Sequence, residues 1–212
     1  GYTCGDLFFQ RRLLDDVTDA LLALKDEMPE GILAVVGAPL EIEGALYNCA
    51  VVLHKGEIIS AVPKTFLPNN GEFYEKRWFQ SGDARRDASV AIPKLKTDVC
   101  RQAIFETEDG VCFGIELCED LWAPLPPSTM LSVEGAEIIL NLSASNELLS
   151  KREYHQPAER ALPVRVCVRF GGHGRIVLRP CVFRAQRDCF LRHGHPGKRR
   201  VSRGQLPDDG GY

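Results

Sequence analysis

A continuous apolar run, Ile32–Gly37, constrains the fold of this chain more than any other local feature. Apolar residues in unbroken succession are typical of a strand that is buried on both faces. The preceding segment, Arg12–Glu27, repeats leucine, valine and alanine at helical spacing, and Pro29 follows it. This pattern predicts an amphipathic helix that ends before the proline and leads into the strand.

Other segments continue the alternation of strands and helices. Four have the length and composition of strands: Tyr47–His54, Glu57–Val62, Val111–Leu117 and Glu137–Leu142. Lys55-Gly56 separates the first two, which predicts a hairpin with a two-residue turn. Ser128 is expected to cap a short helix that runs toward Gly135. We therefore predict an α/β layered fold with one domain over residues 1–154.

The charge distribution indicates a boundary near Tyr154. Residues 1–154 carry 14 Lys and Arg against 25 Asp and Glu, whereas residues 155–212 carry 12 against 4. The regular apolar pattern also stops there, although Arg165–Arg169 alternates valine with arginine, as a solvent-facing strand does. We expect residues 155–212 to be a basic, arginine-rich tail without well-packed structure.

The cysteines and the hydropathy pattern favour a cytoplasmic protein. Eight cysteines are present without a CxxC pair, and the chain is too long and apolar to need a disulfide framework. No apolar run approaches the length of a membrane span, and no signal-peptide pattern opens the chain. We expect reduced cysteines and no membrane partner.

Two blocks carry the candidate chemistry, Val62–Pro68 and Gly114–Asp120, in which Lys64 and Cys118 lie 54 residues apart. Cys118 follows the predicted strand at a point where prolines force a turn. Such a turn exposes a nucleophile and aims neighbouring N–H groups at the same space. A thiol reacts as its thiolate, so a nearby cation is needed, and Lys64 is the candidate. The alternative is an inert core cysteine.

Lys64 and Glu75 each have a second interpretation. Lys64 ends an apolar strand and is expected to point toward the interior, although a solvated lysine at a strand end is the common case. Glu75 lies eleven residues later in a charged stretch, where surface ion pairs are the simplest interpretation.

Taken together, these blocks resemble the nitrilase superfamily of carbon-nitrogen hydrolases. Within it they are similar to the glutamine-hydrolysing domain of glutamine-dependent NAD+ synthetases. The resemblance covers most of residues 1–154 and implies a four-layer αββα sandwich. It also implies roles for three residues, with Cys118 as nucleophile, Lys64 as catalytic lysine and Glu75 as the supporting carboxylate.

The same resemblance implies a substrate site and partners. Tyr2 matches a tyrosine that lines the glutamine pocket, and Ser145 and Lys151 match contacts for the amino-acid end of glutamine. Glutamine hydrolysis in this family proceeds through a cysteine thioester and needs no cofactor. ATP and Mg²⁺ are implied only for a synthetase domain, which the family carries further along the same chain and which has no counterpart in this sequence. A homo-oligomer is also implied. From the residues of the tail we expect no nucleic-acid partner.

The family pattern is incomplete at its start. Its general-base glutamate stands a few residues before the match to Gly1-Tyr2, together with a first strand, and Asp6 lies on the wrong side of the motif to replace it. We therefore expect this chain to be weakly active or inactive as a glutaminase. Two alternatives remain, a stand-alone nitrilase-like amidase and an inactive truncated fragment.

The basic tail offers no convincing site of its own. Its cysteines and histidines fit no common zinc spacing, namely Cys181, Cys189, His193 and His195. Its arginines lack the interleaved aromatic residues or the amphipathic helix typical of nucleic-acid binding.

We predict instead that the tail is an out-of-frame translation. Reverse translation read one base later permits Ser-Ala-Arg from Glu159–Leu162, Ala-Tyr-Val-Tyr-Ala-Ser-Ala-Gly from Arg165–Gly172 and Ser-Gly-His-Asn-Val-Ile-Ala-Ser from Phe183–Phe190. These strings resemble the continuation of the family in the correct order. Sequencing the encoding DNA should reveal a one-base slip near Tyr154. A continuous frame through Tyr212 would contradict this prediction.

Overall fold

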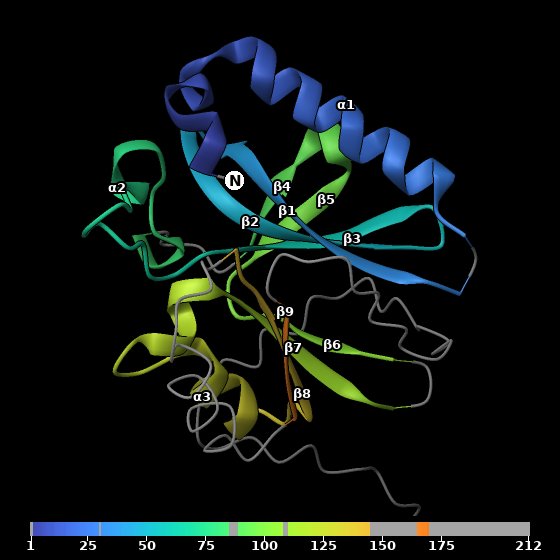
Figure 1. Cartoon of the computed structure of the whole chain (residues 1–212). Helices are drawn as coiled ribbons and strands as arrows, with labels where there is room; N and C mark the ends of the chain where they lie inside the picture. Colours follow the sequence, from blue (N-terminus) through green and yellow to red (C-terminus); the bar gives the residue numbers. More distant parts are fainter. Residues whose placement is uncertain (1, 30, 85–88, 108–109, 145–164, 170–212) are drawn as a thin grey trace, which may run out of the picture.

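A computed structural model describes residues 2–29, 31–84, 89–107, 110–144 and 165–169. These residues form four layers: a long helix, a five-stranded sheet, a four-stranded sheet and a short helix (Figure 1). The predicted αββα sandwich is therefore confirmed, and the layers follow the alternation of apolar strands and amphipathic helices along the chain.

The first sheet is mostly antiparallel. Its strands are β1 (Leu33–Ile42), β2 (Ala45–His54), β3 (Glu57–Pro63), β4 (Ser89–Ile92) and β5 (Thr97–Cys100). Their order is β1-β2-β3-β5-β4, with β3 and β5 parallel. Two 3₁₀ helices lie in the connections, η2 (Gly82–Ala84) and η3 (Pro93–Leu95).

The β2–β3 hairpin has the predicted two-residue turn. Lys55 has a φ of 48° and Gly56 a φ of 73°, so both residues adopt the left-handed conformation. A turn with two positive φ values matches the right-handed twist of antiparallel strands. The hairpin sets the direction of β3 and so brings its last residue, Pro63, back beside Cys49 in the middle of β2.

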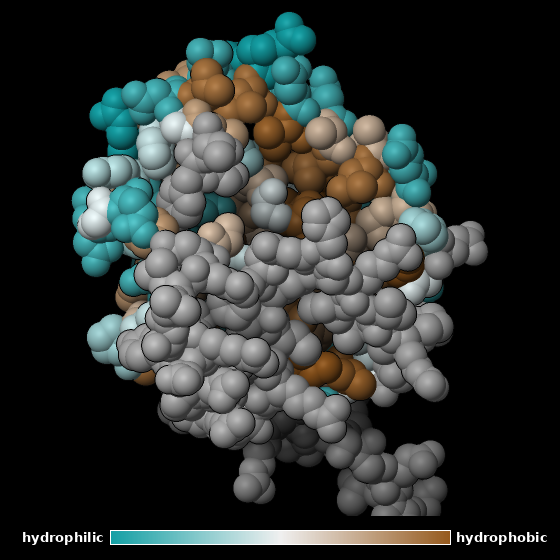
Figure 2. Space-filling view, in the orientation of Figure 1, coloured by the Kyte–Doolittle hydropathy of each residue, from teal (hydrophilic) through white to brown (hydrophobic). Residues whose placement is uncertain are grey.

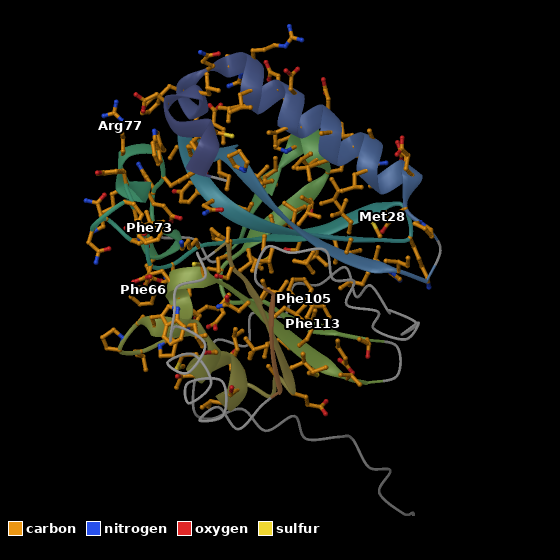
Figure 3. All side chains as sticks on the ribbon, in the orientation of Figure 1. Met28, Phe66, Phe73, Arg77, Phe105 and Phe113 are labelled. Atoms are coloured by element: carbon orange, nitrogen blue, oxygen red, sulfur yellow. The ribbon has the colours of Figure 1, made fainter. Side chains whose placement is uncertain are left out.

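The second sheet carries the candidate nucleophile. Its strands are β6 (Ile104–Glu106), β7 (Cys112–Leu117), β8 (Ile138–Leu142) and β9 (Arg165–Arg169), in the order β6-β7-β8-β9. Phe105 and Phe113 stack across β6 and β7 with ring centroids 5.1 Å apart (Figure 3). β7, β8 and β9 are parallel to one another.

Strand β9 belongs to the basic tail. The valine–arginine alternation correctly indicated a strand, and β9 pairs with β8 from Ile138↔Arg165 to Leu142↔Arg169. A strand therefore lies within residues 155–212, which we expected to lack well-packed structure. Residues 155–164 and 170–212 lie outside the described part of the chain.

Apolar side chains from both sheets meet in one core. Its buried members are Ala50, Val52, Val62, Cys100, Ala103, Phe113, Ile115, Leu117 and Leu140. Because they come from the central strands of the two sheets, the sheets pack face to face. This packing brings the end of β3 toward the end of β7.

Helices cover the outer faces. Helix α1 (Arg11–Glu27) packs its apolar side, including buried Leu21, against the first sheet. In Figure 2 hydrophilic residues lie along the outer side of this helix, and apolar residues gather on the side toward the sheet. Helix α3 (Pro127–Val133) places buried Leu131 on the second sheet. The remaining elements are η1 (Tyr2–Phe9), α2 (Glu75–Trp78) and η4 (Cys118–Trp122).

Two local predictions are wrong. Strand β1 is not buried on both faces, because Ile32 is 49% exposed and residues 33–36 are half-buried. In the described part of the chain β1 stands at the sheet edge and pairs with β2 alone. Ser128 does not cap α3, since the helix begins at Pro127, a residue favoured in a first turn.

Among the helices that the structure describes, none is long and apolar enough to cross a bilayer.

The contact between α3 and β7 predicts a glycine requirement. A Cβ atom on Gly114 would lie 2.8 Å from Leu131 Cδ1 and 3.2 Å from Leu131 Cβ. Gly114→Ala should therefore lower the free energy of unfolding by about 1–3 kcal/mol through overpacking, measured by urea titration. Gly37→Ala is the matched control, because a Cβ there meets nothing within 4 Å. Equal stability of both variants would contradict the prediction.

Candidate active site

Lys64 follows directly after β3 and is fixed by its own peptide groups. Its N–H donates to the carbonyl of Asn48 at 2.8 Å, and its carbonyl accepts from the N–H of Gly82 at 2.8 Å. A side chain at position 82 has no room, since a Cβ would lie 3.0 Å from Pro63 Cγ. The Lys64 side chain is 1% exposed, which confirms that it points toward the interior.

The buried ammonium group of Lys64 is paired with Glu75. Lys64 Nζ lies 2.9 Å from Oε1 and 2.8 Å from Oε2 of Glu75, and this glutamate is 3% exposed. A charge taken out of water needs such a partner, so Glu75 is not in a surface ion pair. The pair is held in place because Glu75 opens α2, whose Arg77 and Trp78 side chains bind the start of the chain.

The anchor of α2 is Asp6 in η1. Asp6 accepts two hydrogen bonds from Arg77 at 2.7 and 2.8 Å and one from Trp78 Nε1 at 2.9 Å. Phe8 packs edge-on against Trp78 and Phe79, with centroids 5.7 and 4.9 Å apart. The Arg77 and Trp78 bonds hold the pKa of Asp6 well below its usual range. Asp6 therefore positions a helix and is no general base.

Cys118 occupies a strained turn at the end of β7. Its φ is 45°, in the left-handed region, which costs a non-glycine residue about 1–3 kcal/mol. The turn takes the cysteine out of the strand, as the sequence predicted, and leaves it half-buried. The hydroxyl of Ser143, just after β8, donates to Cys118 Sγ at 3.3 Å. The thiol thus has a defined polar neighbour.

Asp120 in η4 connects the two candidate segments. Its Oδ2 accepts from the N–H of Leu117 at 2.9 Å, and its Oδ1 accepts from the N–H groups of Thr65 and Phe66 at 3.1 and 2.6 Å. Figure 3 labels Phe66 on the loop beside η4. Burial raises the pKa of Asp120 to about 7, against the lowering effects of the Phe66 and Leu117 bonds and the charge of Lys64.

Glu116 forms a second buried network behind the nucleophile. It is 1% exposed, accepts from the backbone N–H of Ser128 at 3.1 Å and accepts from Nδ2 of Asn141 at 3.2 Å. Burial raises the pKa of its carboxyl group. Asn141 Nδ2 also lies 3.5 Å from the carbonyl of Cys118. These contacts connect β7 and β8 directly below the turn.

The sequence predicted no role for four of these residues: Glu116, Asp120, Asn141 and Ser143. A local signal existed for Asp120, because an acidic residue three positions after a strand end can accept from the N–H of that last residue. No local pattern indicates that its other oxygen reaches Thr65 and Phe66, more than 50 positions away.

The predicted substrate residues are not placed by the structure. Tyr2 begins η1, but its side chain lies outside the described part, and so do Ser145 and Lys151. Their roles stay predictions.

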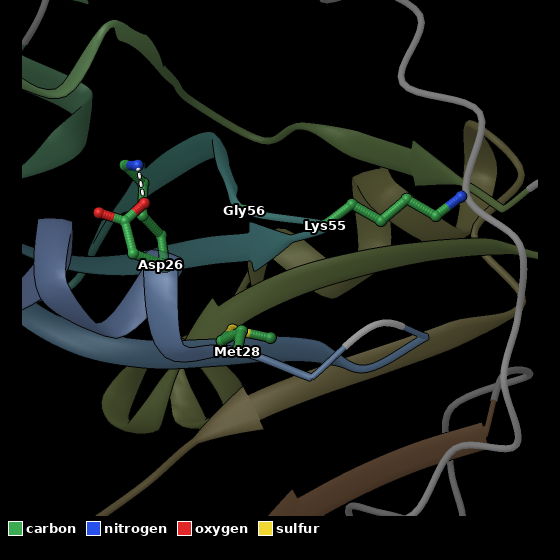
Figure 4. Close-up of a pocket in the computed structure, with 5 residues that line it drawn as sticks. Asp26, Met28, Lys55 and Gly56 are labelled. Carbon is green, nitrogen blue, oxygen red and sulfur yellow. Dashed lines mark hydrogen bonds and ion pairs between the residues drawn. The ribbon is translucent and has the colours of Figure 1, made fainter.

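A surface pocket lies at the other end of β3. Lys25, Asp26 and Met28 from the end of α1 line it, together with Lys55 and Gly56 from the hairpin turn (Figure 4). Lys64 follows the opposite end of that strand, so the pocket is separate from the candidate site. In the part of the chain that the structure describes, no group of three His, Cys, Asp or Glu residues is arranged to hold a metal ion.

The arrangement provides two of the groups that acyl transfer from an amide requires, a nucleophile and a cation. A half-buried cysteine at a strained turn can attack a carbonyl carbon, and a lysine held by a carboxylate can stabilise the oxygen that becomes negative. Asp120 accepts hydrogen bonds from both segments that carry these groups, and Glu116 supports the Cys118 side alone.

Solved structures with the same fold are proteins of the nitrilase type. The chain superposes on the glutamine-dependent NAD+ synthetase of Acinetobacter baumannii with a TM-score of 0.63 and 27% identity, over 78% of this chain and 28% of that one. It shares the fold of a Nesterenkonia amidase of the nitrilase superfamily, with a TM-score of 0.55 and 19% identity over 86% and 62% of the two chains. Fold and site thus define a nitrilase-like α/β protein.

The carbon-nitrogen hydrolase family model matches residues 12–167, and the chain belongs to this family of enzymes. It is 36% identical over 168 residues to the glutamine-dependent NAD(+) synthetase of Mycobacterium tuberculosis, covering 78% of this chain and 25% of the relative. The human protein of the same name is 31% identical over 159 residues, covering 71% and 22%. The chain therefore spans about a quarter of the length of these curated relatives.

The buried ion pair predicts that removing only one partner destabilises the protein far more than removing both. Lys64→Met leaves the Glu75 carboxylate buried without its cation and should lower the free energy of unfolding by about 3–5 kcal/mol. Lys64→Met combined with Glu75→Leu should recover most of that loss, as seen in urea titrations. Lys94→Met, which breaks an exposed pair with Asp15 at 3.3 Å, should cost less than about 1 kcal/mol. A double variant no more stable than Lys64→Met would contradict this account.

Proposed function

We propose that this chain is the glutamine-hydrolysing part of a glutamine-dependent NAD+ synthetase. One observation carries the proposal: the Lys64–Glu75 pair is tied through Asp120 to the turn of Cys118, in a chain 36% identical to such a synthetase. The ammonia released would serve ATP-dependent amidation of deamido-NAD+ on a synthetase domain of the same protein. ATP and Mg²⁺ belong to that domain, and the glutaminase step uses neither.

The proposed reaction begins with the Cys118 thiolate. It attacks the side-chain amide carbon of glutamine, the C=O electron pair moves to oxygen, and Lys64 with a backbone N–H group stabilises the resulting negative charge. When the tetrahedral intermediate collapses, the C–N bond breaks and the nitrogen takes a proton and leaves as ammonia. Water then hydrolyses the thioester, giving glutamate and the free thiol.

Glu75 has a supporting role in this scheme. Both of its oxygens lie within 3 Å of Lys64 Nζ, so it keeps the lysine charged and directed in a buried place. Each proton transfer needs a general base, for which the family uses a glutamate that has no match in this sequence. The proposed substrate contacts are Tyr2, Ser145 and Lys151. Assembly into a homo-oligomer and a cytoplasmic location also stay predictions.

Ammonia release from glutamine tests the proposal. Cys118→Ala should reduce release to background, because the proposed thioester forms on the sulfur of Cys118. Cys112→Ala is the matched control, since Cys112 lies at the other end of β7 and is similarly half-buried. This control should keep the wild-type rate, measured with an enzymatic ammonia assay.

A slow enzyme requires a second measurement. A chloroketone analogue of glutamine should alkylate Cys118 in preference to Cys112, as shown by peptide mass spectrometry, and excess glutamine should protect Cys118. Folded protein that neither releases ammonia nor shows this preference would contradict the proposal. Faster hydrolysis of another amide than of glutamine would favour a stand-alone amidase.

A further inference from the structure

Asp120 is a buried carboxylate to which the proposed reaction assigns no chemical step. It is 1% exposed, and backbone N–H donors occupy both of its oxygens. A carboxylate with this set of partners is poorly placed to take a proton from a thiol or from water. Its contacts indicate a different use.

The donors belong to the two segments that carry the reacting groups. Thr65 and Phe66 come directly after Lys64, and Leu117 comes directly before Cys118. Lys64 extends from the first sheet and Cys118 from the second, so the backbone pairing within either sheet does not fix one relative to the other. Most of the interface between the sheets consists of apolar side chains. Asp120 adds a directional polar connection at the point where the site is assembled.

We propose that Asp120 is a positioning residue that holds Lys64 at its working distance from Cys118 by binding the backbone on both sides of the sheet interface. The inference rests on the proposed function, because it assumes that Cys118 reacts as a thiolate stabilised by Lys64. Displacement of a catalytic group by about 1 Å can cost about 10²-fold in rate, so a connection of this kind has a direct chemical effect.

The charged groups around Asp120 determine how its removal should act. Lys64 and Glu116 are the charges that influence its carboxyl group, and Glu75 partly balances Lys64. Removing a negative group near a thiol by itself favours the thiolate. Loss of the connection has the opposite effect, because the lysine can then move away from the thiol. A role through charge alone therefore predicts that removing Asp120 makes the Cys118 thiolate easier to form. A positioning role predicts that it becomes harder to form.

Asp120→Asn is the test variant. The two side chains have nearly the same shape, and one amide oxygen can still accept from Thr65 and Phe66. The amide nitrogen then faces the N–H of Leu117, and two donors repel, so one of the two connections is lost. Glu116→Gln is the matched control. It also replaces a carboxylate that is 1% exposed and accepts from two elements, but it does not contact the loop after Lys64.

The measurement is the pH profile of iodoacetamide alkylation at Cys118, followed by peptide mass spectrometry. In Asp120→Asn we expect the pH at half-maximal rate to rise relative to wild type. In Glu116→Gln we expect no rise, although urea titration should show that its stability also falls. If Asp120→Asn does not fold, Asp120→Glu carries the same expectation with a smaller rise, because its longer arm shifts both connections but keeps an acceptor oxygen for each.

Each result separates the inference from the proposed function. If Cys118 in the wild-type chain reacts no faster than Cys112 at neutral pH, the positioning role is overturned, and ammonia release from glutamine decides the proposed function. If wild-type Cys118 is selectively reactive and folded Asp120→Asn shows an unchanged or lower midpoint, the positioning role is overturned and the proposed function stands. An equal rise in Glu116→Gln would also overturn it, because any buried carboxylate would then have the same effect.

Discussion

A lysine ammonium group in the core can stay charged only with a carboxylate beside it, and the arrangement around Lys64 follows from this requirement. Glu75 meets it with both oxygens. Glu75 in turn needs a fixed helix, and α2 has four residues, too few to be stable alone. Asp6 and Phe8 supply the missing stability by holding Arg77 and Trp78. Contacts near the start of the chain thus help to hold Glu75 beside Lys64, because all of them act on one short helix.

The conformation of Cys118 is strained, and hydrogen bonds of neighbouring residues maintain it. The left-handed conformation at Cys118 is unfavourable for a residue with a side chain, so the surrounding structure must impose it. Asp120 holds the residue before the turn, and Asn141 contacts the carbonyl of Cys118 itself. Both side chains are buried, and their hydrogen bonds are therefore worth more than at the surface. Strain at one residue is offset by polar contacts at its neighbours.

Much of this could be predicted from local pattern. The apolar run before Lys64 correctly placed it at an inward strand end, and the turn after Leu117 correctly placed Cys118 outside the strand. The partner of Lys64 was harder to predict, because a glutamate among charged residues is usually exposed. The half-burial of β1 was missed because periodicity does not reveal which strand stands at an edge. The contacts of Asp120 depend on how two sheets face each other, which no local pattern contains.

The segment that carries the lysine and its glutamate is closed at its base. The carbonyl of Lys64 accepts from Gly82, and the lack of a side chain at Gly82 lets the two ends of the segment touch. Residues 69–72 at the far end of this loop are exposed. Because the entropy of closing a loop grows only slowly with its length, relatives can lengthen or shorten this tip at little thermodynamic cost. A change of length at the tip therefore need not alter the geometry at the base. The tip can evolve separately from the lysine and its glutamate.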